Sequence, residues 1–242
     1  MEDIKKIISS KNIFTLRMNH VFDFLKSEGV PLEKLRAIEV FGGIGKTDVV
    51  LAKNVKMFEI WEIDEKLKPQ LEKSFPNAKI KICDSIEILN KTKKIQKFDL
   101  VLIDNPMSVF GTKKNSHEYC EHFDIIKNIE NLIDKEAIVI FLVNKKPFFA
   151  KKLKKRNILW RKRRQEFYGN VDTNNMSVQF LTSFYTELFR SLGLMTIFVN
   201  SIPRHNPHLD YFIFLLRKNH KPNKDSLKTM DWVSLYPLLS KK

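Results

Sequence analysis

Short apolar runs of this chain end in acidic residues, and the first run also leads into glycines. In chain order these residues are Glu39, Gly43, Gly45, Glu62, Asp84 and Asp104. Carboxylates accept hydrogen bonds from hydroxyl and amino groups, and glycines let the backbone approach a ligand closely and turn sharply. The pattern therefore predicts a nucleotide-binding site built from the ends of several strands.

Two common nucleotide motifs match the first of these segments only in part. The tripeptide 45–47 matches the end of a P-loop, but Val40 stands where the first glycine of that loop belongs. Gly43 and Gly45 match the dinucleotide fingerprint, but Asp48 occupies the third glycine position, where helix and strand should touch. A third interpretation fits better.

Segment 39–45, with the pattern Glu-x-Phe-x-Gly-x-Gly, resembles motif I of class I S-adenosylmethionine-dependent methyltransferases. The resemblance implies that its acid and glycine loop hold the methionine part of the cofactor. Segment 61–64 resembles motif II, whose acid binds the ribose hydroxyls, with Glu62 as first choice and Asp64 as second. Segment 81–85 resembles motif III, whose aspartate accepts from the adenine amino group. The cofactor-binding residues implied are Glu39, Phe41, Gly43, Gly45, Glu62, Ile63, Asp84, Ser85 and Asp104.

Segment 98–107 resembles motif IV, which faces the transferred methyl group. Its end is similar to the Asp/Asn-Pro-Pro-Tyr/Phe motif of amino-methyltransferases, which accepts hydrogen bonds from the target amino group. By this resemblance Asp104, Asn105 and Pro106 are the candidate catalytic residues. Asn105 replaces the first proline and Met107 replaces the stacking aromatic residue. This departure weakens the specific expectation of nitrogen-directed base methylation.

Besides a small-molecule or protein methyltransferase whose basic helix serves only for localisation, three alternatives stay open. The motif I pattern of this chain is also similar to that of cytosine-C5 methyltransferases. Those enzymes need a Pro-Cys nucleophile, whereas Met107 follows Pro106 here. Aminopropyltransferases of the spermidine synthase type share the fold, but their polycationic substrate needs an acidic pocket. A non-catalytic methyltransferase-like subunit, which presents nucleic acid to a protein partner, is the third.

Positive charge is concentrated in one segment. The formal net charge is +15 at pH 7, and segment 145–164 contains eleven basic residues and no acidic residue. Such a patch predicts an anionic partner, most often RNA or DNA; an acidic membrane surface and a nuclear-import-like signal are the alternatives. Lys and Arg would contact phosphates, and Trp160 or Tyr168 would stack on an unpaired base. The predicted nucleic-acid-binding residues are Lys151, Lys152, Lys154, Lys155, Arg156, Trp160, Arg161, Arg163 and Arg164.

Apolar runs alternate with amphipathic stretches along most of the chain. Strands are predicted at 37–41, 57–63, 79–83, 98–103, 137–143, 195–200 and 211–217. Helices are predicted at 46–53, 67–74, 86–89, 119–132 and 180–192, and within the basic segment. This order predicts an α/β fold with a doubly wound, mostly parallel seven-stranded sheet, an antiparallel last strand and helices on both faces. Residues 1–34 are predicted as a helical extension, and 35–242 as a methyltransferase-like domain with a basic insertion at about 145–178.

Composition narrows the cellular context. The longest apolar runs, such as 137–143, are far shorter than the roughly 20 residues of a membrane span, and no secretory signal is visible. Two cysteines, Cys83 and Cys120, fit a reducing cytoplasm, with the nucleus possible from the basic segment. The spacing of His117, Cys120 and His122 matches no zinc site, so no metal is expected.

Overall fold

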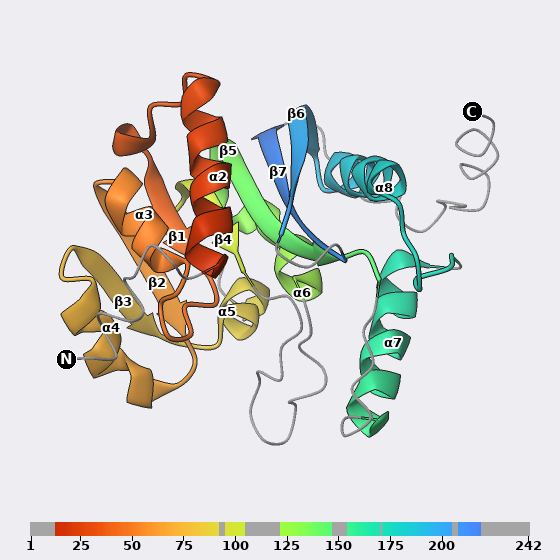
Figure 1. Ribbon diagram of the computed structural model, residues 1–242, viewed down its shortest axis with the longest axis horizontal. Helices are drawn as coiled ribbons and strands as arrows, with labels where there is room; N and C mark the ends of the chain where they lie inside the picture. The colour runs from red at the N-terminus through yellow and green to blue at the C-terminus, as the bar shows by residue number, and fades with distance from the viewer. Residues whose placement is uncertain are drawn as a thin grey trace.

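Apolar strands form the centre of the molecule as a single seven-stranded sheet (Figure 1). The computed structural model describes residues 13–91, 95–104, 122–146, 154–169, 171–204 and 208–218. The strands are β1 (Arg36–Glu39), β2 (Met57–Glu62), β3 (Ala78–Ile82), β4 (Phe98–Ile103), β5 (Ile133–Asn144), β6 (Leu194–Pro203) and β7 (Leu209–Lys218). Strand β4 and residues 137–143 of β5 are almost continuously apolar, as expected of parallel strands buried on both faces.

The strands lie in the order β3-β2-β1-β4-β5-β7-β6. Strands β1 to β5 pair in parallel, whereas β7 is antiparallel to both β5 and β6. The chain winds outward from β1 in one direction and then from β4 in the other. In such sheets the ligand crevice lies outside the carboxyl ends of the strands at this switch point.

Helices cover both faces of the sheet, which confirms the predicted doubly wound fold (Figure 1). The first face carries α2 (Ile13–Ser27), α3 (Asp48–Asn54) and α4 (Lys68–Ser74). The second face carries α5 (Ser85–Lys91), α6 (Phe123–Ile126), α7 (Lys154–Tyr168) and α8 (Val178–Ser191). Short 3-10 turns occur at Leu32–Lys34, Glu65–Leu67 and Ile129–Asn131. Within the described ranges, no helix combines the length and apolarity that a membrane crossing requires.

Two helix predictions differ from the structure. A single helix was expected at 119–132, of which 119–121 lies outside the described residues. The rest forms the short helix α6 and the 3-10 turn after it. The basic helix α7 begins at Lys154 and runs on to Tyr168, past the expected end at 164. The residues expected to give its apolar face before that point, Phe149 and Leu153, lie outside the described residues.

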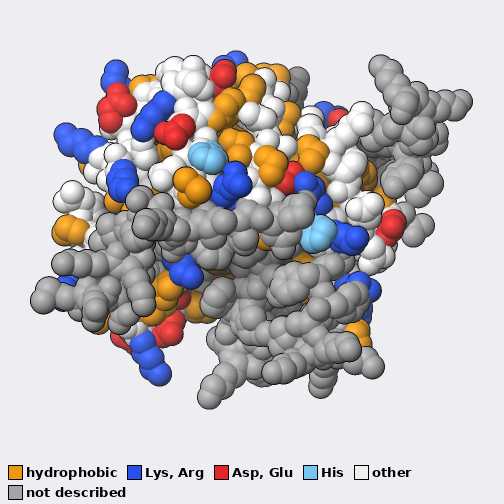
Figure 2. All heavy atoms as spheres, viewed as in Figure 1, with side chains coloured by type: hydrophobic (Ala, Val, Ile, Leu, Met, Phe, Trp, Pro, Cys, Tyr) orange, Lys and Arg blue, Asp and Glu red, His pale blue; other side chains and the backbone are white. Residues whose placement is uncertain are grey.

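The two edge strands of the sheet have different surfaces. Edge strand β3 carries Lys79 and Lys81, which blunt an edge against pairing with other chains. Edge strand β6 instead exposes Met195, Ile197 and Phe198, each more than one third accessible. Figure 2 shows hydrophobic side chains gathered on the face between α2 and β6.

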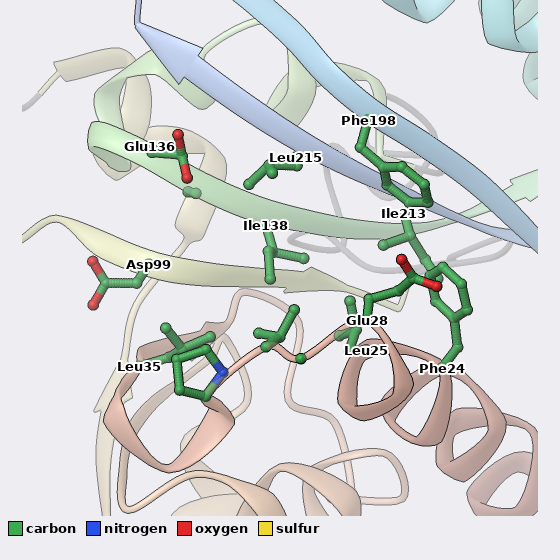
Figure 3. A pocket seen from close by; sticks show the side chains of 14 residues that line it. Phe24, Leu25, Glu28, Leu35, Asp99, Glu136, Ile138, Phe198, Ile213 and Leu215 are labelled. Carbon is green, nitrogen blue, oxygen red and sulfur yellow. The ribbon is translucent and has the colours of Figure 1, made fainter.

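A cavity of about 620 Å³ lies between α2 and the sheet (Figure 3). Its floor is apolar and includes Ile138, Ile213 and Leu215. Leu35 and Asp99 also line it, and these residues lie where β1 and β4 begin. The cavity is therefore at the amino edge of the parallel strands, opposite the predicted site.

His122 is fully buried at the start of α6, between the rings of Phe123 and Phe141. Its Nε2 is hydrogen-bonded to the hydroxyl of Tyr185, which in turn is 2.7 Å from the hydroxyl of Tyr168. Burial lowers the pKa of His122 to about 3, so the ring is neutral near pH 7. The other two members of the sequence cluster, His117 and Cys120, lie outside the described residues.

The buried ring makes stability depend on pH. Because the pKa of His122 is about 3 in the folded chain and near 6.5 when unfolded, the unfolded chain takes up the proton first. The contribution of the neutral His122 ring to the free energy of unfolding is complete above pH 6.5. It is lost on acidification, by about 1.4 kcal/mol per pH unit between pH 6.5 and pH 3. We expect the free energy of unfolding, measured in urea between pH 7 and pH 5, to depend less steeply on pH in His122→Gln than in the native chain. The exposed His20 on α2 provides the control, because His20→Gln should keep the slope of the native chain. Equal slopes in the native chain and His122→Gln would contradict the assignment.

Candidate functional site

Glu39 and Asp104 lie side by side at the carboxyl edge of the sheet. Glu39 ends β1, Asp104 follows β4, and these strands are neighbours with Glu39 level with Leu102. The backbone N–H of Asp104 donates to Oε1 of Glu39 at 3.4 Å, and the N–H of Phe41 donates to the same oxygen at 3.1 Å. The two strand-end acids at the switch point are thus brought together across 65 residues of chain.

The glycine loop between β1 and α3 is tied to the end of β2 by Glu62. The N–H of Gly43 donates to Oε2 of Glu62 at 2.5 Å, and the N–H of Asp64 donates to Oε1 at 2.7 Å. Gly43 and Gly45 have φ angles of +53° and +79°, which side chains rarely tolerate. Glu62 is buried, whereas Asp64 is exposed and caps the 3-10 turn by accepting from the N–H of Lys66. Of the two alternatives, Glu62 is the one hydrogen-bonded to the glycine loop.

Asp84 and Ser85 lie at the carboxyl end of β3, where α5 begins. Oδ1 of Asp84 accepts from the N–H groups of Ile86 and Glu87 at 3.0 and 3.1 Å, so it caps the helix. Ser85 is buried, and Ile63, after β2, is exposed. Asp84 therefore has a structural role at this edge in addition to the role predicted for it.

Asp48 adds a further buried carboxylate to this edge. In the sequence this residue stood out only because it occupies the third glycine position of the dinucleotide fingerprint. Glu39 and Asp48 are fully buried, and Asp104 is largely buried. No hydrogen-bond partner is found for Oε2 of Glu39, for either oxygen of Asp48 or for Oδ1 of Asp104. Buried polar atoms without a partner are rare, and each needs an explanation. Among the described residues, no group of three or more metal-ligating side chains is arranged to hold a metal ion.

The pKa values of these acids reflect their surroundings. Burial, reinforced by the charges of Asp48 and Asp104, raises the pKa of Glu39 well above its usual range. Burial and the charge of Asp104 do the same to the pKa of Asp48. Burial also raises the pKa of Asp104, although the guanidinium of Arg204 opposes that rise. The cluster therefore favours protonated acids when no other cation is near.

Arg204 and Tyr211 complete the edge, and sequence reasoning missed both. The guanidinium of Arg204, directly after β6, lies 3.7 Å from Oδ2 of Asp104 and over the ring of Tyr211 at 5.4 Å. The hydroxyl of Tyr211 donates to the same oxygen at 3.4 Å. Because β6 runs in the same direction as β1 to β5, its carboxyl end reaches the same edge. Applying the strand-end rule to β6 would have found Arg204.

Several predicted residues fall outside the part of the chain that can be described. Asn105 and Pro106 do so among the candidate catalytic residues, and Lys151 and Lys152 among the predicted nucleic-acid contacts. Lys154, Lys155 and Arg156 lie in the first turn of α7, and their side chains are not described. Arg161 is half-buried.

Two predicted nucleic-acid contacts are interior residues, so the surface role assigned to them was wrong. Trp160 is 3% exposed and Arg164 is fully buried. The guanidinium of Arg164 lies over the rings of Trp160 and Tyr168 at 5.3 and 5.4 Å, and it donates to the carbonyl oxygen of Asn144 at 2.7 Å. These residues hold α7 against the end of β5.

Arg163 also has a structural contact within the fold. Its guanidinium forms an ion pair with Asp124 in α6, and it lies 3.8 Å from Glu166 one turn along α7. Lys162, by contrast, is highly exposed and only loosely paired with Glu166 at 3.9 Å. The exposed side of α7 is thus narrower than the sequence predicted.

No known sequence family matches the chain, and comparison with curated protein sequences finds no similar protein. Solved structures with a similar fold include methyltransferases. The N-methyltransferase NodS of Bradyrhizobium japonicum WM9, in complex with S-adenosyl-L-homocysteine, has a TM-score of 0.51 at 9% identity, over 90% of this chain and 97% of NodS. The 1,6-didemethyltoxoflavin N1-methyltransferase of Burkholderia thailandensis, with bound S-adenosylhomocysteine, has a TM-score of 0.50 at 12% identity, over 89% and 87% of the two chains. The chain therefore has the Rossmann-like fold of these enzymes.

The glycine loop offers a direct test of the site geometry. Gly29 and Gly45 both have positive φ, at +76° and +79°, but a Cβ on Gly29 meets nothing within 4 Å, whereas one on Gly45 would lie 2.5 Å from the ring of Phe75. We expect Gly29→Ala to lower the free energy of unfolding by about 1 kcal/mol from the left-handed backbone alone. Gly45→Ala should cost about 3 kcal/mol, because overpacking adds to the same strain. Equal losses in urea unfolding would show that Phe75 does not constrain the loop.

Proposed function

We propose that this protein is an S-adenosylmethionine-dependent methyltransferase that acts on nucleic acid held by its basic segment. The observation that carries the proposal is the group of unpartnered carboxylate oxygens beside the glycine loop, on Glu39, Asp48 and Asp104. S-adenosylmethionine has a positively charged α-ammonium and a positively charged sulfonium. A cationic ligand of this kind would compensate for burial that otherwise has no explanation.

The other strand-end residues fit the rest of the cofactor. Each oxygen of Glu62 already accepts one backbone hydrogen bond, and a carboxylate has about four acceptor positions, so it retains capacity for the two ribose hydroxyls. Asp84 uses Oδ1 to cap α5, which leaves Oδ2 to accept from the adenine amino group. Ile63, Phe41 and Ser85 remain proposed neighbours of the cofactor.

Asp104 is the proposed catalytic residue within the described part of the chain. When bound, the cofactor supplies an electrophilic methyl group. The carboxylate of Asp104 would accept a hydrogen bond from the acceptor group and orient its lone pair, with Asn105 and Pro106 in supporting roles. Arg204 and Tyr211 hold Oδ2 of Asp104 in place, so positioning and electrostatics are prepared before the acceptor arrives.

The basic segment supports nucleic acid as the acceptor class. Segment 145–164, which directly follows β5 in the chain, contains eleven basic residues and no acid, and Figure 1 shows α7 extending away from the sheet. Cations of this kind bind phosphates irrespective of sequence. The burial of Trp160 and Arg164 restricts the proposed contacts to the outward residues of this segment.

Cofactor binding is the first test. Isothermal titration calorimetry with S-adenosylmethionine is expected to give a Kd that rises at least about tenfold in Glu62→Gln, equivalent to about 1.4 kcal/mol. Gln lacks the negative charge and one acceptor oxygen for the ribose hydroxyls. Asp64→Asn is the matched control, because Asp64 is exposed and caps the adjacent turn, and it should bind as the native chain does. Loss of binding in Asp64→Asn alone would reverse this assignment, and no binding by the native chain would refute the proposed cofactor.

Nucleic-acid binding is tested by its salt dependence. For a labelled single-stranded RNA, the slope of log affinity against log salt should become less steep by about 2 when Lys154, Lys155 and Arg156 are all changed to Gln, since each lost phosphate contact removes about 0.7. Changing the exposed Lys66, Lys68 and Lys73 to Gln alters the net charge equally and serves as the control. Equal changes of slope in both triple variants would show that the basic segment has no special role.

A further inference from the structure

Asp48 is the first residue of α3 and directly follows the glycine loop. Its side chain is fully buried, and neither carboxylate oxygen has a hydrogen-bond partner. Thr47 precedes it at the cap position, and no side-chain cap hydrogen bond forms there. The position near the helix N-terminus and the residue's own backbone N–H favour the charged form of Asp48, but full burial without a partner on another residue still costs free energy.

The surroundings of Asp48 are mostly acidic. Glu39 faces it from the end of β1, Asp104 from the end of β4, and the more distant Glu62 from the end of β2. Arg204, after β6, and Tyr211, on β7, both contact Asp104. Arg204 therefore compensates for the charge of Asp104, whereas no ion pair or hydrogen bond from another described residue is found for the carboxyl group of Asp48.

We infer that Asp48 is a further cofactor-binding residue, whose buried carboxyl group exchanges a proton for a cationic group of the cofactor. The O–H bond of the acid breaks, its proton passes to water or buffer, and the resulting carboxylate forms an ion pair with the cofactor. This inference rests on the proposed function. It explains why an acid occupies a position that a dinucleotide-binding loop would give to glycine.

Exchange of this kind has a measurable consequence, which is proton release on binding. The full-length chain is titrated with S-adenosylmethionine at pH 7 in buffers of different ionisation enthalpy. The apparent binding enthalpy should change linearly with that ionisation enthalpy, with a slope of about one proton released. Because the neighbouring acids titrate together with Asp48, the proton is assigned by substitution rather than by the titration alone.

Asp48→Asn is the decisive variant, since it keeps the shape and removes both the charge and the proton. It should bind S-adenosylmethionine at least tenfold more weakly and release no proton. Cofactor-free Asp48→Asn should unfold at the same temperature as the native chain or higher, because a neutral amide replaces a buried unpartnered acid. A lower unfolding temperature together with unchanged affinity would show that Asp48 is structural, and would overturn the inference.

Two related probes identify the cationic group. S-adenosylhomocysteine keeps the α-ammonium but has no sulfonium, whereas 5′-methylthioadenosine has neither. Proton release with both S-adenosylmethionine and S-adenosylhomocysteine assigns the ammonium, and release with S-adenosylmethionine alone assigns the sulfonium. Equal release with 5′-methylthioadenosine overturns the inference, since no cation is then required.

The failure of this inference can be told apart from failure of the proposed function. Binding of S-adenosylmethionine without proton release, and with equal affinity in Asp48→Asn, would reject the role of Asp48 and leave the proposed cofactor standing. No binding by the native chain would reject both.

Discussion

The parallel direction of β1, β2 and β4 forces their terminal carboxylates to one edge of the sheet, and the remaining features of the site depend on this. Like charges that are brought together away from water are costly. The backbone offsets part of that cost, because N–H groups of the glycine loop and of the strand ends donate to Glu62 and Glu39. Arg204 and Tyr211 offset another part at Asp104. The two hydrophobic cores on either face of the sheet hold the strands in place despite the cost that remains.

The order of strands and helices was predictable because buried parallel strands are continuously apolar, and the winding follows from their alternation with helices. The strand-end acids could be located by the same rule. Burial of individual polar residues was not predictable, because the aromatic rings and the carbonyl oxygens of Asn144 and Thr173 that surround Arg164 come from other parts of the chain as well as from α7. Tyr211 reaches Asp104 from 107 residues away, and only the reversal of the chain at β7 makes that contact possible.

The two edges of the sheet meet different requirements. Lysines on β3 oppose the addition of another strand, and one of them, Lys79, also pairs with the buried Glu59 at 2.9 Å. Strand β6 has no such protection at its exposed apolar residues. Its Phe198 instead stacks on Phe24 of α2, at 5.8 Å between ring centroids, so one helix shields part of the second edge. The site lies between these two edges. Of its acids, only Asp84 lies beside an edge strand, β3, and the others lie at the ends of inner strands or on α3.

Helix α7 attaches to the domain through the side that carries Trp160, Arg164 and Tyr168. The anchor is internal, whereas Lys162 on the outward side is exposed and pairs only loosely with Glu166 of the same helix, a contact that adds little stability. Substitutions on that outward side can accumulate without a loss of stability, whereas changes to the anchor detach the helix. Under the proposed function, recognition of the acceptor could therefore diverge in evolution, or be redesigned in the laboratory, independently of the sheet and of its strand ends.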